Sequence, residues 1–257
     1  MSNGTFITVL GSSGGRYDYG NDTASYLINN KVIIDTGWNL VENILDLGLN
    51  PAEFKTVLFT HLHHDHYLAL PQFLFYYINA GRSLNELTFI GPEDLNLVVN
   101  LAANFLQLSR FYKDIGFPQC IEIKSGESIT LDGEQLFIET HKSLHPVDGR
   151  YYRVTDIATG TKIGFSGDTA YSPDESIFFK DCGLLFHECS LGGKYTGDNF
   201  YLHASAEEAA VVAAESGVKK LALIHYSEKS RAECFKAAAD KFHGEILTPA
   251  KGDIIYC

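Results

Sequence analysis

The segment His61-Leu62-His63-His64-Asp65-His66 constrains the chain more than any other. It directly follows an apolar run, Thr56 to Phe59, that predicts a buried strand, so the cluster lies where a strand ends and a loop begins. Neighbouring side chains along a turn point in different directions, so donors packed this closely do not fit one tetrahedral ion. The cluster predicts two ions, with His61 and His63 on one and Asp65 and His66 on the other. The alternative is a histidine-rich surface loop.

Size and charge limit the partners. The 257 residues are 45% hydrophobic without an interrupting linker composition, so we expect one domain over residues 1–257. With 20 basic and 32 acidic residues the net charge is −12, which disfavours an extended nucleic acid as partner. A small phosphorylated ligand remains compatible, because bound dications reverse the field locally.

Cysteine usage and apolar runs indicate a compartment. The five cysteines are an odd number without a C-x-x-C pair, which is typical of reduced thiols in the cytoplasm. No secretory signal precedes the first apolar run. The longest apolar run, 68–80, contains Pro71 and is too short to span a bilayer. We therefore expect a cytoplasmic protein without a membrane partner.

Hydrophobic periodicity predicts a strand-rich first part and a second part in which strands and helices alternate. Such an order suggests sheets covered on the outside by helices. An antiparallel meander is expected over 119–140, continued at 151–155 and 162–166. The other expected strands are 5–10, 24–29, 31–35, 56–59, 87–90, 184–186, 221–224 and 253–256, and the expected helices are 40–47, 68–80, 93–112, 204–217 and 231–242.

Two further segments have open interpretations. Gly11 to Gly15 precedes a strand rather than a helix, so a loop at the edge of a site is favoured over a dinucleotide-binding loop. The end of the helix expected over 93–112 carries Phe105, Phe111 and Tyr112. With Phe117 they either overhang the metals and stack on a base or pack in the core.

Four more residues stand at or near strand ends, where a two-metal site needs ligands. His145, Asp168 and His225 are candidate ligands, although a lone Asp after Gly is usually a turn or cap residue and a lone His after a strand is more often a core residue than a ligand. Asp35 ends an apolar strand and either orients a ligand histidine or caps the next helix. Their order along the chain favours a role for them in the metal site.

Taken together, these segments resemble the motifs of the metallo-β-lactamase-fold hydrolases, and within them the ribonuclease Z-like phosphodiesterases. The resemblance spans nearly the whole chain. The matching segments are Gly11 to Gly15, Asp35-Thr36-Gly37, His61 to His66, His145 with Tyr152-Arg153-Val154, Gly167-Asp168, His187-Glu188-Cys189-Ser190, His203-Ala204-Ser205-Ala206 and His225.

The resemblance implies an α/β (α+β) fold, a four-layer αββα sandwich with the metal site at one edge of its two sheets. It also implies two divalent ions; Zn²⁺ is the first expectation, with Mn²⁺ or Fe²⁺ as alternatives. A homodimer is expected by analogy. One ion would be held by His61, His63 and His145, the other by Asp65, His66 and His225, with Asp168 bridging them.

The same resemblance implies attack on phosphorus by hydroxide shared between the ions, with His203 as general acid, Glu188 orienting it and Asp65 helping to position the nucleophile. His64 and His141 are expected outside the ligand set, and 192–201 could form a lip beside His203.

The segment between His145 and Asp168 bears on the substrate. Ribonuclease Z proteins insert a long tRNA-gripping arm there, whereas this chain has only 22 residues, 146–167. Members without the arm include cyclic-nucleotide-degrading enzymes such as anti-Pycsar proteins. We expect hydrolysis of a small, cyclic nucleotide phosphodiester. Alternatives are a ribonuclease Z-type tRNA 3′ endonuclease, a hydrolase of lactones, thioesters or β-lactams, a diiron redox protein and a non-catalytic binding protein.

Overall fold

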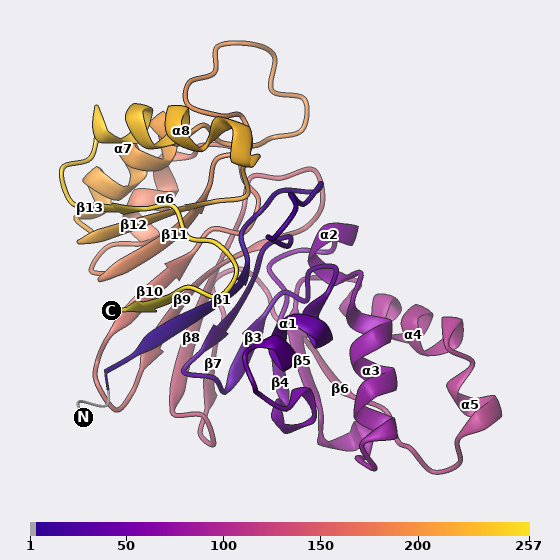
Figure 1. The fold of residues 1–257 in the computed structure, drawn as a ribbon. Coiled ribbons are helices and arrows are strands. Elements are labelled where there is room, and N and C mark those ends of the chain that lie inside the picture. The colour runs from indigo at the N-terminus through magenta and orange to yellow at the C-terminus, as the bar shows by residue number, and fades with distance from the viewer. Residues whose placement is uncertain (1–3) are drawn as a thin grey trace.

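Two mixed β-sheets stacked face to face form the centre of the computed structural model, which describes residues 4–257 (Figure 1). The first sheet has the order β14 (Ile254–Tyr256), β1 (Phe6–Gly11), β2 (Ser25–Ile28), β3 (Val32–Ile34), β4 (Thr56–Leu58), β5 (Thr88–Gly91) and β6 (Gln119–Glu122). The second has the order β13 (Glu245–Leu247), β12 (Lys220–Ile224), β11 (Leu184–Glu188), β10 (Lys162–Phe165), β9 (Arg150–Asp156), β8 (Leu136–Lys142) and β7 (Ser128–Leu131).

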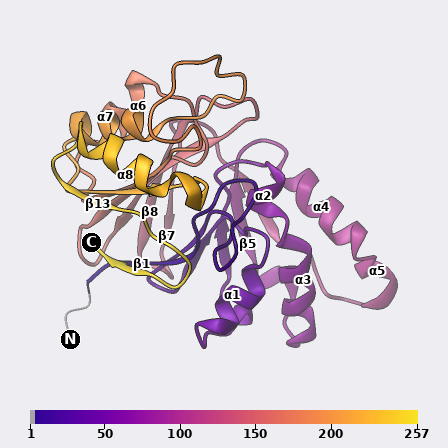
Figure 2. The ribbon, with the colours of Figure 1, turned by 45° about the horizontal axis from the view of Figure 1, so that its top comes forward.

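Helices cover the outer face of each sheet, as Figures 1 and 2 show. Beside the first sheet lie α1 (Leu40–Asp46), α2 (His64–Tyr67), α3 (Leu70–Asn79), α4 (Leu95–Phe105) and α5 (Leu108–Phe111). Beside the second lie α6 (Pro173–Phe178), α7 (Ala206–Ser216) and α8 (Arg231–Ala239). Within residues 4–257, no helix combines the length and apolar character needed to cross a membrane.

Three hydrophobic clusters correspond to the three interfaces between these layers. Because successive side chains of a strand point to opposite faces, a strand buried on both sides feeds two clusters. In β3, Val32 and Ile34 pack between the sheets while Ile33 packs under the helices. In β12, Ala222 packs between the sheets while Leu221 packs under α7 and α8. The expected αββα sandwich is confirmed.

Strand direction brings distant segments to one edge. Strands β3 to β6 are parallel to one another, as are β10 to β13. Open parallel sheets bind ligands outside the carboxyl ends of their strands. In this chain, β3 and β4 end before Asp35 and His61, and β10 and β12 end before Asp168 and His225.

The helix expected over 93–112 is broken. It divides into α4 and α5 at Gln107, whose φ of 50° lies in the left-handed region. The turn costs helix propensity, but it places Leu108 in the buried cluster under the helices. Tertiary packing therefore overrides the uninterrupted apolar pattern.

The antiparallel meander expected over 119–140 is wrong in its first strand. Strand β6 pairs with β5 in parallel, in the first sheet, while β7 and β8 pair antiparallel in the second. The chain thus crosses from one sheet to the other near Gly126. In the sequence, a glycine at such a crossing cannot be told from a glycine in a hairpin turn.

Candidate functional site

The predicted metal ligands gather at the shared edge of the two sheets and fall into two groups. Within each group, one potential ligand atom per residue lies within 4.8 Å of those of all the others. Asp168 belongs to both groups, as a bridging ligand must. The groups are His61, His63, His145 and Asp168, and Asp65, His66, His225 and Asp168.

Distances around Asp168 are those of ligands surrounding a common point. Its Oδ2 lies 3.6 Å from His61 Nε2 and 3.4 Å from His225 Nε2, and its Oδ1 lies 3.4 Å from His66 Nε2. These separations exceed ordinary hydrogen bonds but are short enough for a cation to contact both partners.

Buried polar atoms without partners test whether metal fits this site. Within residues 4–257, His61 Nε2, His66 Nε2 and Asp168 Oδ1 are buried and make no hydrogen bond. An unsatisfied buried polar atom costs about 1–3 kcal/mol, so three of them facing one space need a common partner. Divalent metal would satisfy them all, and a set rich in imidazole with carboxylates suits zinc, manganese or iron.

Protein groups fix the ring of each of three histidines. His66 Nδ1 lies 2.8 Å from Asp35 Oδ2, so Asp35 orients His66, one of the two roles expected for it. His145 Nδ1 donates to the Leu202 carbonyl at 3.1 Å. A nitrogen that is occupied in this way leaves Nε2 of the same ring for the metal.

Ser190 performs the corresponding role for His225, and sequence reasoning missed it. Its Oγ lies 2.5 Å from His225 Nδ1. The residue stands within the segment His187 to Ser190 that carries the family resemblance, but a serine in a loop has no spacing signal of its own. The Leu202 carbonyl was missed because a backbone oxygen has no residue signal at all.

Metal binding requires neutral imidazoles and ionised carboxylates, and electrostatics favour these states for His61 and Asp168. Burial lowers the pKa of His61 well below its usual value, and the neighbouring His66 lowers it further. Burial alone would raise the pKa of Asp168, but the imidazoles of His225 and His66 hold it well below the usual range. His61 is therefore neutral and Asp168 ionised at neutral pH. Burial works against a charged His66 or His225, but Asp168 and Asp65 leave the pKa values of both above the usual value, so metal must displace their protons.

His203 and Glu188 form a pair beside Asp168. His203 Nδ1 lies 2.7 Å from Glu188 Oε1 and 3.9 Å from Asp168 Oδ2. Glu188 is buried and held by the backbone N–H groups of Thr169 and Ser190, each at 2.9 Å. Burial opposes protonation of His203, yet the hydrogen bond to Glu188 leaves its pKa above the usual value. This imidazole can therefore hold a proton next to the ligand groups.

The glycine-rich segment lies at the edge of the site, as expected. A Cβ on Gly15 would come within 3.3 Å of Asp65 Oδ2, and one on Gly14 within 3.2 Å of the His225 carbonyl oxygen. Both positions allow close approach of the backbone to the cluster, for which the absence of a side chain suits glycine.

Other residues considered from the sequence lie away from the ligands. His64 is exposed, and the ring of His141 stacks on those of Tyr151 and Phe178, which also contact each other. The aromatics of 105–117 do not overhang the cluster, because α5 lies far from α2 in Figures 1 and 2. Phe105 and Phe111 are exposed, whereas Tyr112 packs against the hydrophobic cluster under the helices.

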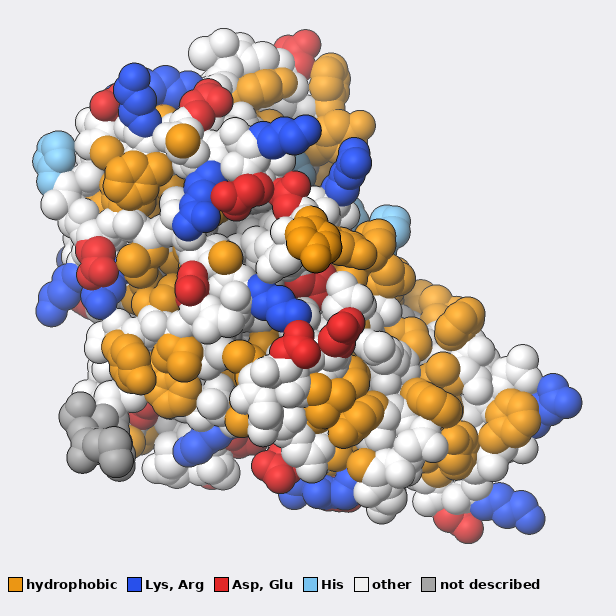
Figure 3. Space-filling model, viewed as in Figure 1, with side chains coloured by type: hydrophobic (Ala, Val, Ile, Leu, Met, Phe, Trp, Pro, Cys, Tyr) orange, Lys and Arg blue, Asp and Glu red, His pale blue; other side chains and the backbone are white. Residues whose placement is uncertain are grey.

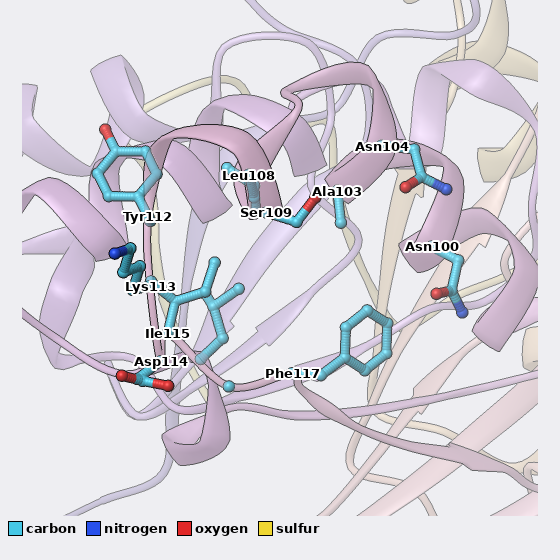
Figure 4. A pocket seen from close by; sticks show the side chains of 12 residues that line it. Asn100, Ala103, Asn104, Leu108, Ser109, Tyr112, Lys113, Asp114, Ile115 and Phe117 are labelled. Carbon is cyan, nitrogen blue, oxygen red and sulfur yellow. The ribbon is translucent and has the colours of Figure 1, made fainter.

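A cavity of about 530 Å³ lies beside α4 and α5 (Figure 4). Phe117 and Tyr112 line it, together with Asn100 and Asn104, and none of the predicted metal ligands does. It is therefore separate from the candidate metal site.

Comparisons with known proteins bear on the family and the fold. Residues 7–245 match the family model described as anti-Pycsar protein Apyc1. The ribonuclease Z of Picrophilus torridus is 24% identical over 87% of this chain and 86% of its own. The structure of YhfI from Bacillus subtilis, a metallo-β-lactamase fold protein, is 21% identical with a TM-score of 0.83 over 99% of this chain and 100% of its own. Yeast PDE1 is 12% identical with a TM-score of 0.73 over 99% of both chains.

Proposed function

The chain belongs to the anti-Pycsar protein Apyc1 family, and from that membership and its site we propose that it hydrolyses small cyclic nucleotide phosphodiesters with two bound divalent ions. It is a metal-dependent hydrolase of the metallo-β-lactamase fold, with ribonuclease Z among its relatives. The substrate and the roles of individual residues are the proposal.

One observation carries it: Asp168 is shared by two ligand groups, and a protonatable histidine held by a buried glutamate stands beside it. Two metal-binding positions suit displacement at phosphorus, where charge develops on several oxygens at once. A positioned proton donor suits a leaving oxygen that departs as an alkoxide. A single-metal or purely binding site would need neither feature.

We assign the seven ligands to the two ions from the two groups. His61, His63 and His145 would hold one, Asp65, His66 and His225 the other, and Asp168 both. When bound, such ions lower the pKa of water and neutralise charge on the phosphate oxygens. Zinc is our first choice because five of the seven ligands are imidazoles, with manganese or iron as alternatives.

His203 would deliver the proton. Its Nδ1 is bonded to Glu188, so Nε2, which makes no hydrogen bond within residues 4–257, is the nitrogen available to the leaving oxygen. Glu188 fixes the ring, and its hydrogen bond favours the protonated imidazole against the effect of burial. Asp65, whose side chain is partly accessible, would orient the attacking water through a carboxylate oxygen.

The size of the site favours a compact substrate. Half of residues 146–167 lie in β9 and β10, which pair antiparallel and are joined by the short turn 157–161. That leaves no segment for a tRNA-binding arm. The net charge of −12 also opposes an extended polyanion, whereas a cyclic mononucleotide needs only the local field of the site.

A substrate panel tests this function. Zinc- and manganese-loaded protein would be given 3′,5′-cyclic and 2′,3′-cyclic mononucleotides, a precursor tRNA and a lactone. We expect turnover of cyclic nucleotides that is lost in Asp168→Ala and kept in the control Asp132→Ala, an exposed aspartate in a turn. Cleavage of precursor tRNA alone, or of the lactone alone, would overturn the proposed substrate.

We also propose a homodimer formed through α4. Its residues Leu97, Leu101 and Phe105 are spaced by four and are 55%, 58% and 78% exposed. Figure 3 shows hydrophobic side chains along α4 and α5. The helix contains no charged residue, although the chain carries a net charge of −12. An uncharged face is where two copies with the same net charge can meet without repulsion, and exposed apolar stripes mark such contacts.

A further inference from the structure

Two residues of the site, His145 and His203, depend on one tight turn between β11 and α7. The Leu202 N–H donates to the Asn199 carbonyl at 3.3 Å, which closes a turn with Phe200 and Tyr201 at its exposed corners. Leu202 has a φ of 53°, a left-handed conformation that costs free energy in a residue with a side chain. The surrounding contacts must therefore hold this turn in place.

The Asn199 carboxamide supplies two of those contacts. Its Oδ1 accepts the His203 backbone N–H at 3.0 Å, and its Nδ2 donates to the His203 carbonyl at 2.7 Å. An amide side chain offers one acceptor and a donor group in one plane, which matches both backbone groups of a single residue. Asn199 thus holds the His203 backbone from both sides.

The turn acts on the site through two atoms. The Leu202 carbonyl, directly before His203, accepts the hydrogen bond of His145 Nδ1 and so sets the direction of His145 Nε2. The His203 backbone position determines whether its Nδ1 reaches Glu188. Both histidines would shift if the turn relaxed.

We propose that Asn199 is a positioning residue: its carboxamide fixes the His203 backbone for proton delivery and, through the Leu202 carbonyl, orients His145 towards the metal. The part concerning proton delivery rests on the proposed function, whereas the part concerning His145 requires only that the cluster binds metal.

The test compares Asn199→Ala with the wild type and with Asn100→Ala. Asn100 is an exposed asparagine of α4 whose amide, among residues 4–257, donates to Asn96 alone, so its replacement controls for loss of an asparagine. Asn199→Asp keeps the acceptor for the His203 N–H but loses the donor, so its effects should lie between those of the wild type and Asn199→Ala.

The first readout is metal affinity, measured without substrate by competition with a chromogenic chelator. Loss of an outer hydrogen bond to a ligand typically weakens metal binding about 10–100-fold. Because Asn199 acts through one intervening residue, we expect Asn199→Ala to weaken zinc binding about 10-fold, and Asn100→Ala to leave it unchanged. Unchanged affinity in Asn199→Ala would overturn the role towards His145.

The second readout is the dependence on the leaving group. Two substrates are compared: an aryl phosphodiester that releases p-nitrophenolate and an alkyl phosphodiester that releases an alkoxide. The p-nitrophenolate leaves without a proton, whereas the alkoxide needs one. With a misplaced His203, hydrolysis of the alkyl phosphodiester should fall at least about 10-fold more than that of the aryl phosphodiester. An equal fall for both substrates, or none for either, would overturn the role towards His203.

These readouts separate the proposal from the proposed function. If wild-type protein hydrolyses neither phosphodiester, the proposed function fails while chelator competition still decides the role towards His145. If Asn199→Ala does not fold, judged by circular dichroism, Asn199→Asp decides both parts with the same criteria.

Discussion

Each of three site histidines presents Nε2 to the shared space because a protein group occupies its Nδ1. The partners are the Asp35 carboxylate for His66, the Leu202 carbonyl for His145 and the Ser190 hydroxyl for His225. These outer contacts fix tautomer and ring direction before a metal arrives, which is how such contacts raise affinity.

At the same scale, His203 distinguishes phosphodiester cleavage from other reactions of a metal site. We predict that His203→Ala lowers hydrolysis of a cyclic nucleotide about 10²–10⁴-fold because the leaving oxygen loses its proton donor. Bound metal, measured by elemental analysis, should stay at the wild-type level. Wild-type rates in His203→Ala would show that another group protonates the leaving oxygen.

The sequence predicted which residues converge but not everything that holds them. The predicted metal ligands, of which His61 is the first and His225 the last, stand at or near strand ends and in a recognisable order. Their placement together could therefore be anticipated. Ser190, Asn199 and the Leu202 carbonyl act through contacts between segments distant in sequence or through backbone atoms. Neither kind of contact leaves a residue pattern.

At the scale of elements, a buried network joins α6 to β11 behind Glu188. Glu175 and His187 are both fully buried, and His187 Nε2 lies 2.7 Å from Glu175 Oε2. His187 Nδ1 donates to the Glu188 carbonyl at 2.8 Å, and Tyr151 donates to Glu175. Burial works against a charged His187, but the hydrogen bond to Glu175 leaves its pKa above the usual value.

We predict that Glu175→Gln lowers the free energy of unfolding by about 3–5 kcal/mol near pH 6, because His187 loses its buried partner. A raised pKa in the folded state means that the contribution is complete below the unfolded pKa of about 6.5 and declines as pH rises through the folded pKa. The difference from wild type should therefore shrink at high pH.

Urea unfolding of the metal-free protein at several pH values measures this difference. Glu215→Gln, an exposed glutamate of α7, is the matched control and should differ little from wild type at any pH. A Glu175→Gln effect that is absent, or equal at all pH values, would show that the pair is not ionised in the folded protein.

Element prediction succeeded where local patterns were sufficient. Buried strands such as β3 and β12 were found from short apolar runs. Helix α6 was missed although Ser172 and Glu175 form a capping box at its start, a signal that was available in the sequence. The partner sheet of β6 and the break at Gln107 depend on tertiary packing, which no local pattern encodes.

At the scale of the whole molecule, the uncharged face of α4 predicts self-association. Light scattering should give the mass of a dimer for wild type and of a monomer for Leu101→Glu, because the substitution buries unpaired charge in the interface. Leu45→Glu, an exposed leucine of α1, should remain dimeric. A monomeric wild type, or a dimeric Leu101→Glu, would contradict an α4 interface.

Zinc titration of metal-free protein, with cyclic nucleotide hydrolysis followed at each step, tests most directly whether two ions held through Asp168 carry out the reaction. We predict activity that is absent without metal, rises to a plateau at two equivalents and is lost in Asp168→Ala. Hydrolysis that needs no metal, saturates at one equivalent or persists in Asp168→Ala would contradict the dimetal site.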